Sequence, residues 1–119
     1  MRDPAQEHYE RGNESYRAGR LDDAAEAYEA AVAALTPEHD PVATDVYENL
    51  ALTLWQLGQL RPAIRAFYRV LDGNPTARQQ SLRGLVSCLF RDGRALDGER
   101  LLEIYERTFG RHPEGWKRS

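Results

Sequence analysis

The sequence contains a single cysteine, Cys88, among its 119 residues. One thiol cannot form a disulfide within the chain, and it cannot build a cysteine cluster around a metal ion. Cys88 stands in an apolar helical stretch, where we expect it to be a small buried side chain.

Long hydrophobic runs are also missing. No apolar stretch approaches the roughly 18 residues that a membrane-spanning helix needs. The opening residues, MRDPAQE, are too polar for a secretory signal. The sequence therefore predicts a cytoplasmic protein that makes no membrane contact.

Catalytic and phosphate-binding motifs are absent as well. The three histidines stand in different segments, and none has a carboxylate at a spacing typical of a catalytic pair. These are His8, His39 and His112. No glycine-rich loop that could cradle a phosphate occurs. We expect no enzyme activity, no cofactor and no metal site.

Charge is divided unevenly along the chain. The first 60 residues hold 4 basic and 12 acidic side chains, whereas the remainder holds 12 basic and 7 acidic ones. Arginines in the later half could pair with phosphates. However, the net charge of −3 and the lack of a recognition motif argue against nucleic acid as the partner. A solvated arginine face is the simpler interpretation.

Proline and glycine divide the sequence into helical stretches. Three capping residues precede a proline, which is a signal for a helix start: Asp3-Pro4, Asp40-Pro41 and Asn74-Pro75. Three glycines, Gly19, Gly58 and Gly93, suit the left-handed conformation that ends a helix. The apolar spacing between these marks predicts six helices and no strands. Their expected ranges are 4–17, 21–35, 42–57, 61–72, 75–91 and 95–109, with a loop over 36–40.

The turn glycines recur at intervals of 39 and 35 residues, which is typical of a helix-turn-helix repeat with a small insertion in the first linker. Five residues after each glycine the side chain is small, and nine residues after it the side chain is large and apolar. The small set is Ala24, Ala63 and Gly98, and the large set is Tyr28, Phe67 and Leu102. This alternation lets the ridges of one helix fit the grooves of another.

These residues resemble a tetratricopeptide repeat. The first match is Gly12-Asn13, Tyr16, Gly19, Leu21, Ala24, Tyr28 and Ala31, and the second is Tyr47, Leu50-Ala51, Gly58, Leu60, Ala63, Phe67, Leu71 and Pro75. A third copy is looser, with Gly98 and Tyr105 at positions that usually carry small residues such as alanine. The resemblance implies an α-solenoid of three repeats, over about 4–37, 42–75 and 76–110, in one domain of residues 1–110. Residues 111–119 would form a polar tail.

The resemblance further implies a right-handed superhelix whose first helices line a concave groove that binds a peptide or protein segment. We expect eight side chains to line that groove: Tyr9, Asn13, Tyr16, Asn49, Leu52, Trp55, Arg83 and Phe90. An aromatic residue precedes each turn glycine by three positions, and such rings are effective anchors for a partner. The other interpretation is that these rings only pack against the second helices.

Some relatives bind the terminal carboxylate of a chaperone with two asparagines and several basic residues. Asn13 and Asn49 match the asparagines of that clamp. Tyr9, Gln80 and Gly84 stand where its basic residues belong, and charge-assisted bonds carry most of such binding. The clamp is therefore incomplete, and the asparagines are expected to bond partner backbone instead.

Self-assembly is the alternative function. If no capping helix follows the third repeat, apolar side chains of the last helix remain exposed and favour self-association. These are Leu101, Leu102, Ile104, Tyr105 and Phe109. A tail folded back with Trp116 as cover is an equal alternative. The acidic end of one copy could also meet the basic end of the next. A nucleic-acid module using the arginine face ranks below both.

Overall fold

The structure is a computed structural model that describes residues 3–110 and contains no strand in that range. Its α-helices are α1 (Pro4–Arg17), α2 (Leu21–Ala33), α3 (Asp40–Gln56), α4 (Leu60–Leu71), α5 (Gln79–Arg91) and α6 (Ala95–Phe109). The expected all-helical solenoid is confirmed. Trp116 and the rest of the expected tail lie outside the described residues.

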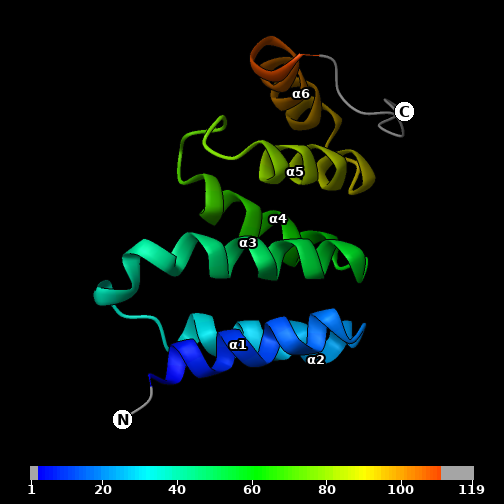
Figure 1. Cartoon of the computed structure of the whole chain (residues 1–119). Coiled ribbons are helices and arrows are strands. Elements are labelled where there is room, and N and C mark those ends of the chain that lie inside the picture. Colours follow the sequence, from blue (N-terminus) through cyan, green and yellow to red (C-terminus); the bar gives the residue numbers. More distant parts are fainter. Residues whose placement is uncertain (1–2, 111–119) are drawn as a thin grey trace.

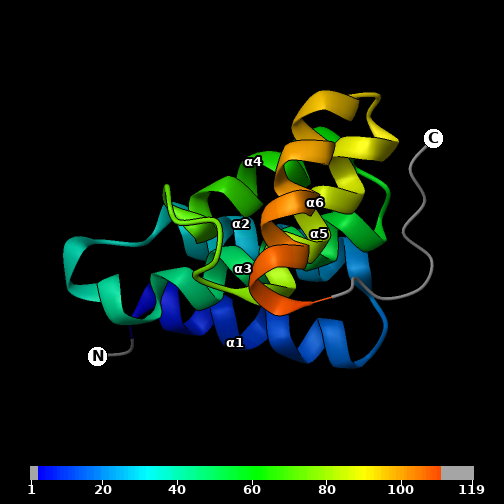
Figure 2. The same ribbon diagram turned by 90° about the horizontal axis from the view of Figure 1, so that it is seen from above.

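The helices form three antiparallel pairs that stack in chain order, α1 with α2, α3 with α4, and α5 with α6 (Figure 1). The second helix of each pair also packs against the first helix of the next, α2 on α3 and α4 on α5. Successive pairs turn relative to one another, so that α6 runs across the direction of α1 (Figure 2). The result is an elongated body of 48 × 28 × 20 Å.

The turn within each pair follows the glycine signal. Gly19, Gly58 and Gly93 have φ of 78°, 78° and 80°, which side chains with a Cβ rarely adopt. The residue after each glycine donates its backbone N–H to a carbonyl of the preceding helix, as Arg20 does to Ser15 at 2.9 Å. These bonds satisfy carbonyls that the helix end would otherwise leave without a partner.

The expected start of the fifth helix at residue 75 is wrong, because α5 begins at Gln79. The side chain of Asn74 accepts a hydrogen bond from the backbone N–H of Thr76 at 3.2 Å, and Ala77 N–H donates to the carbonyl of Asn74 at 3.1 Å. Asparagine thus holds a local turn instead of capping a helix. The proline signal places the boundary nearby but does not tell a turn from a cap.

The first linker is more ordered than the expected loop. Residues Pro37–His39 form a short 3₁₀ helix, η1, and α3 begins directly after it at Asp40. Nδ1 of His39 accepts the backbone N–H of Thr36 at 2.9 Å, and Nε2 of His39 is hydrogen-bonded to Asp3. That bond lowers the pKa of the Asp3 carboxyl. Asp3 also caps α1 through the N–H of Ala5, so the linker is tied to the start of the chain.

The core contains the small and large residues that the repeat pattern pairs. Tyr28, Phe67 and Leu102 are fully buried, and Ala24 and Ala63 are buried against them. Burial of such rings supplies most of the driving force for stacking. Among residues 3–110, no helix combines the length and apolar character that crossing a membrane requires.

Candidate partner-binding cleft

A cleft of about 350 Å³ lies along the first helices of the three pairs. Its lining comes from all three of them: Tyr16 of α1, Leu52, Trp55 and Gln56 of α3, and Gln80 and Arg91 of α5. Three of the eight side chains expected in the groove, Tyr16, Leu52 and Trp55, therefore meet in one place. A volume of this size can hold one or two side chains of a bound segment.

Tyr16 and Trp55 take different roles in this cleft. Tyr16 is 36% exposed, and its hydroxyl oxygen accepts a hydrogen bond from the side-chain amide of Gln56. The ring of Trp55 meets the ring of Phe67 edge to face at 6.1 Å, while the residue as a whole is only half-buried. Trp55 thus packs on the second helix and also lines the cleft.

Phe90 and Arg83 lie elsewhere on α5. The ring of Phe90 lies against Gly98 of α6, where an added Cβ would be 3.2 Å from three ring carbons. Arg83 is exposed and, like Phe90, does not line the cleft. α5 therefore faces the cleft with Gln80 and Arg91 instead of the two residues expected there.

Tyr9, Asn13 and Asn49 form a separate polar network beside the cleft. Asn49 Nδ2 donates to Tyr9 Oη at 3.0 Å and to Asn13 Oδ1 at 3.2 Å. Asn13 Oδ1 also accepts the hydroxyl proton of Tyr28 at 2.6 Å. Burial raises the pKa of Tyr28 to about 12, because the charged phenolate is disfavoured away from water. The structure thus brings the two expected asparagines together.

This network leaves one donor and one acceptor over. Asn13 Nδ2 and Asn49 Oδ1 have no hydrogen-bond partner among residues 3–110. A peptide backbone offers a carbonyl acceptor and an N–H donor. The carbonyl can accept from the amide N–H of Asn13, and the N–H can donate to the amide carbonyl of Asn49. The pair can therefore bond a passing backbone without a basic side chain.

Sequence reasoning missed Gln56, Gln80 and Arg91. A signal for two of them was present, since the residue two before each turn glycine is a long polar side chain: Arg17, Gln56 and Arg91. Helical spacing places this position next to the aromatic one and toward the preceding pair. The bond from Gln56 to Tyr16 of the preceding pair follows that geometry.

Acidic side chains of α3 are neutralised within the fold. Arg78 binds Asp45 at 2.8 Å and Glu48 at 3.1 Å, and the buried hydroxyl of Ser81 donates to Glu48 at 2.6 Å. The two carboxylates hold the pKa of Arg78 above its usual value. These charges join the second pair to the third and do not line the cleft.

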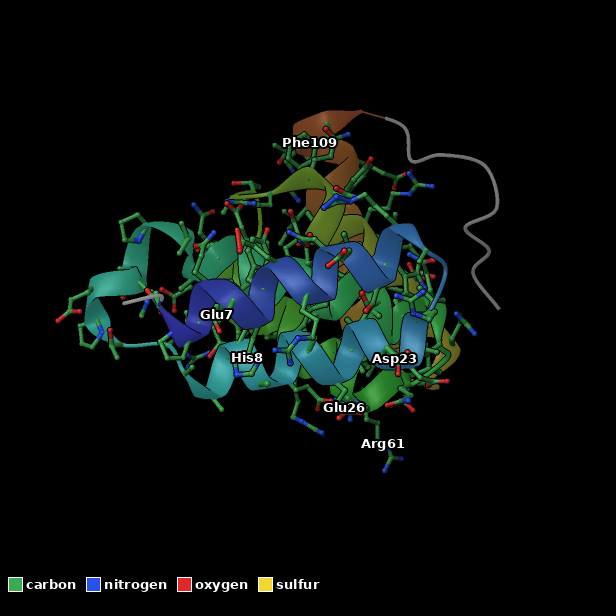
Figure 3. The ribbon with its side chains drawn as sticks, turned by 60° about the horizontal axis from the view of Figure 1, so that its bottom comes forward. Glu7, His8, Asp23, Glu26, Arg61 and Phe109 are labelled. Carbon is green, nitrogen blue, oxygen red and sulfur yellow. The ribbon has the colours of Figure 1, made fainter. Side chains whose placement is uncertain are left out.

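A larger cavity, of about 480 Å³, opens on the outer face of the first pair (Figure 3). His8 of α1 faces it together with Asp23 and Glu26 of α2, and the arginines Arg11 and Arg20 complete a mixed-charge lining. None of the side chains expected in the groove lines it. Its size alone therefore does not make it the partner site.

The last helix buries part of its apolar face. Leu102 and Tyr105 are buried, whereas Leu101, Ile104 and Phe109 are half-buried and pack against the core. Tyr105 also accepts a hydrogen bond from the side chain of Gln79 at 3.0 Å. The large exposed apolar residue of α6 is instead Leu96, which the sequence did not single out.

Among residues 3–110, no three His, Cys, Asp or Glu side chains gather closely enough to hold an ion. The chemistry of the cleft is therefore that of aromatic, amide and guanidinium groups.

Comparison with known proteins agrees with the repeat geometry. The family model described as Tetratricopeptide repeat matches residues 9–81, which is more than half of the chain. No curated protein matches the chain. The matched residues include both turns Gly19 and Gly58, the buried rings of Tyr28 and Phe67, and most of the cleft. The chain belongs to the tetratricopeptide repeat family.

Proposed function

We propose that the chain is a protein-interaction module that holds an extended segment of a partner protein in the cleft along α1, α3 and α5. Tetratricopeptide repeats are generally protein-interaction modules and typically not catalysts. The observation that carries the proposal is the meeting of Tyr16, Leu52 and Trp55 from two pairs in one cleft of about 350 Å³. Accessible aromatic side chains in a concave site are common centres of binding energy.

The polar network next to the cleft supports an extended segment over a single small molecule. Asn13 and Asn49 offer an amide donor and an amide acceptor, which match the backbone of a peptide. A segment that crosses from α1 to α5 could use these backbone bonds for affinity and the cleft for side-chain selection.

Affinity capture with variants tests this proposal. The wild type, Trp55→Ala and Gln80→Trp are immobilised in equal amounts and exposed to lysate of the native cell. Gln80 is exposed, so the tryptophan fills the cleft without removing a core contact. Tyr68→Ala is the matched control, since Tyr68 is an exposed aromatic residue on α4. Circular dichroism confirms that each variant is folded.

The amount of each protein that the wild type captures should fall about tenfold or more with both cleft variants, as expected for a central anchor. Recovery should be unchanged with Tyr68→Ala. Equal recovery by the wild type and both cleft variants would refute the cleft as the partner site.

Self-assembly through α6 has weaker support. Leu102 and Tyr105 are buried within the chain, so the apolar surface expected there is reduced to half-buried side chains and Leu96. Light scattering at low and high salt tests this alternative, and a monomer at both would remove it.

A further inference from the structure

The two junctions between first helices are equivalent in the repeat but differ in chemistry. At the junction of α1 and α3, the amide of Gln56 donates to the hydroxyl of Tyr16 and joins the two helices. At the junction of α3 and α5, the same two positions carry Arg91 and Trp55. Both side chains line the cleft.

Arg91 and Trp55 cannot make the corresponding bond. The indole of tryptophan has one N–H donor and no acceptor, and a guanidinium has donors only. Neither side chain has a hydrogen-bond acceptor among residues 3–110, and Arg91 has no ion pair there. Trp55 is half-buried, and its indole nitrogen is not fully enclosed, so this N–H remains accessible. The junction of α3 and α5 therefore holds N–H donors without a bonded acceptor, whereas Gln56 and Tyr16 are bonded to each other at the junction of α1 and α3.

The charge of the cleft is equally one-sided. Its lining contains one cation, Arg91, and no acidic side chain. Asp92, which follows Arg91 in the chain, is paired with Arg61 and Arg94. Asp45 and Glu48 of α3 are already bound by Arg78. Apolar surface of Leu52 and Trp55 lies beside this unpaired charge. A ligand that fits must therefore bring an acceptor with negative charge next to an apolar group.

We propose that the cleft selects a partner segment in which an aspartate or glutamate, bound by Arg91, stands beside an apolar side chain held on Leu52 and Trp55. This rests on the proposed function and specifies its ligand. A single free guanidinium matches one carboxylate through two parallel N–H donors. A phosphorylated segment would call for a cluster of arginines, and the lining has one.

The carboxylate belongs to a side chain within the segment and not to its C-terminus. A terminal carboxylate would need basic residues beside Asn13 and Asn49, and Tyr9, Gln80 and Gly84 stand at those positions. Neither asparagine lines the cleft with Arg91. The segment can thus continue past Arg91 in both directions.

Selection from displayed random segments tests the inference. Short random segments, fixed at both ends so that no free C-terminus is offered, are panned on the wild type, Arg91→Glu and Arg65→Glu. Arg65 is an exposed arginine of α4 outside the cleft. Its variant therefore makes the same charge change at a site that does not line the cleft. Sequencing gives the enrichment of each residue type.

On the wild type, segments with Asp or Glu beside an apolar residue should be enriched. Arg91→Glu should remove this acidic preference and favour Lys or Arg, while Arg65→Glu should retain it. An enriched segment, made with an amidated C-terminus, should lose affinity about tenfold or more when its acid is replaced by the neutral amide.

Two results separate the claims. Enrichment without an acidic preference, or an acidic preference that survives Arg91→Glu, would overturn this inference and leave segment binding intact. Failure of the wild type to enrich any segment would count against the proposed function itself.

Discussion

The hydroxyl of Tyr28 on α2 donates a 2.6 Å hydrogen bond to Oδ1 of Asn13 on α1. The bond joins the hydrophobic core to the polar network beside the cleft. Tyr28 is a core ring, 1% exposed, whereas Asn13 belongs to the network beside the cleft. The bond fixes which end of the Asn13 amide faces inward. The core therefore orients the group that we expect to meet a partner backbone.

Replacement of Tyr28 by phenylalanine should lower the free energy of unfolding by about 1 kcal/mol. The ring keeps its packing, but one buried hydrogen bond is lost and Oδ1 of Asn13 loses the hydroxyl donor of Tyr28. Urea denaturation measures the change. Tyr68→Phe is the control, because Tyr68 is exposed and its hydroxyl has no hydrogen-bond partner among residues 3–110. Equal effects of the two substitutions would contradict this role of the bond.

Stability should decline between about pH 10 and pH 12. The pKa of Tyr28 is raised from 10.0 to about 12 in the folded chain, whereas an unfolded tyrosine keeps the ordinary value. In this window the unfolded state has released the proton and the folded state has not. The contribution of Tyr28 is therefore complete below pH 10 and is lost as pH rises through its folded pKa.

Thermal melts of the wild type and Tyr28→Phe over this pH range provide the measurement. The phenylalanine variant should lose melting temperature less steeply, because it has no phenol to ionise at this position. Parallel curves for the two proteins would show that other groups cause the decline.

Alanine at the buried helix glycines should destabilise in a graded order. A Cβ at Gly12 would lie 2.6 Å from two ring carbons of Tyr28, and one at Gly84 would lie closer still to the ring of Phe67. Such overlap forces rings or helices apart, at a cost of about 1–3 kcal/mol. At Gly98 the nearest ring carbons of Phe90 are 3.2 Å away, and the gain in helix propensity of about 1 kcal/mol offsets the contact.

Gly84→Ala and Gly12→Ala should therefore lower the urea midpoint clearly, and Gly98→Ala should leave it nearly unchanged. The three variants control one another, because each adds the same methyl group to a buried helical position. A loss at Gly98 as large as at Gly12 would show that helix separation, and not ring overlap, sets the cost.

Much of the fold follows from local signals in the sequence. Gly19, Gly58 and Gly93 mark turns because their positive φ excludes most other residues, and the spacing of Ala24 and Tyr28 reflects contacts inside one pair. The predicted start of α5 is wrong because Asn74 can cap a helix or hold a turn with the same side-chain oxygen.

The cleft was harder to predict, since its composition depends on how α5 is rotated against α3. Phe90 and Arg91 are neighbours in sequence, yet the ring packs on Gly98 and the guanidinium lines the cleft. Gly84 admits the ring of Phe67 from α4, and Gly98 of α6 admits the ring of Phe90 within the third pair. Sequence spacing shows which side chains share a face of a helix. Which of those faces lines the cleft depends on how the helix packs against its neighbours.

Cys88 should report on opening of the third pair. It is 0% exposed on α5, and burial raises the pKa of its thiol to about 12. The thiolate is the reactive form, so a folded chain at pH 8 should react with a thiol reagent only when α5 opens. Under conditions where closing is faster than reaction, the labelling rate follows the opening equilibrium.

Gly84→Ala should then raise the labelling rate about tenfold for every 1.4 kcal/mol that it removes from the stability of α5. Gly12→Ala changes the first pair, so it should speed labelling less for the same loss of global stability if the third pair opens by itself. Equal acceleration by both variants would mean that Cys88 is exposed only when the whole chain unfolds. Rapid labelling of the wild type, at the rate of a free thiol, would contradict the burial of Cys88 between α5 and its neighbours.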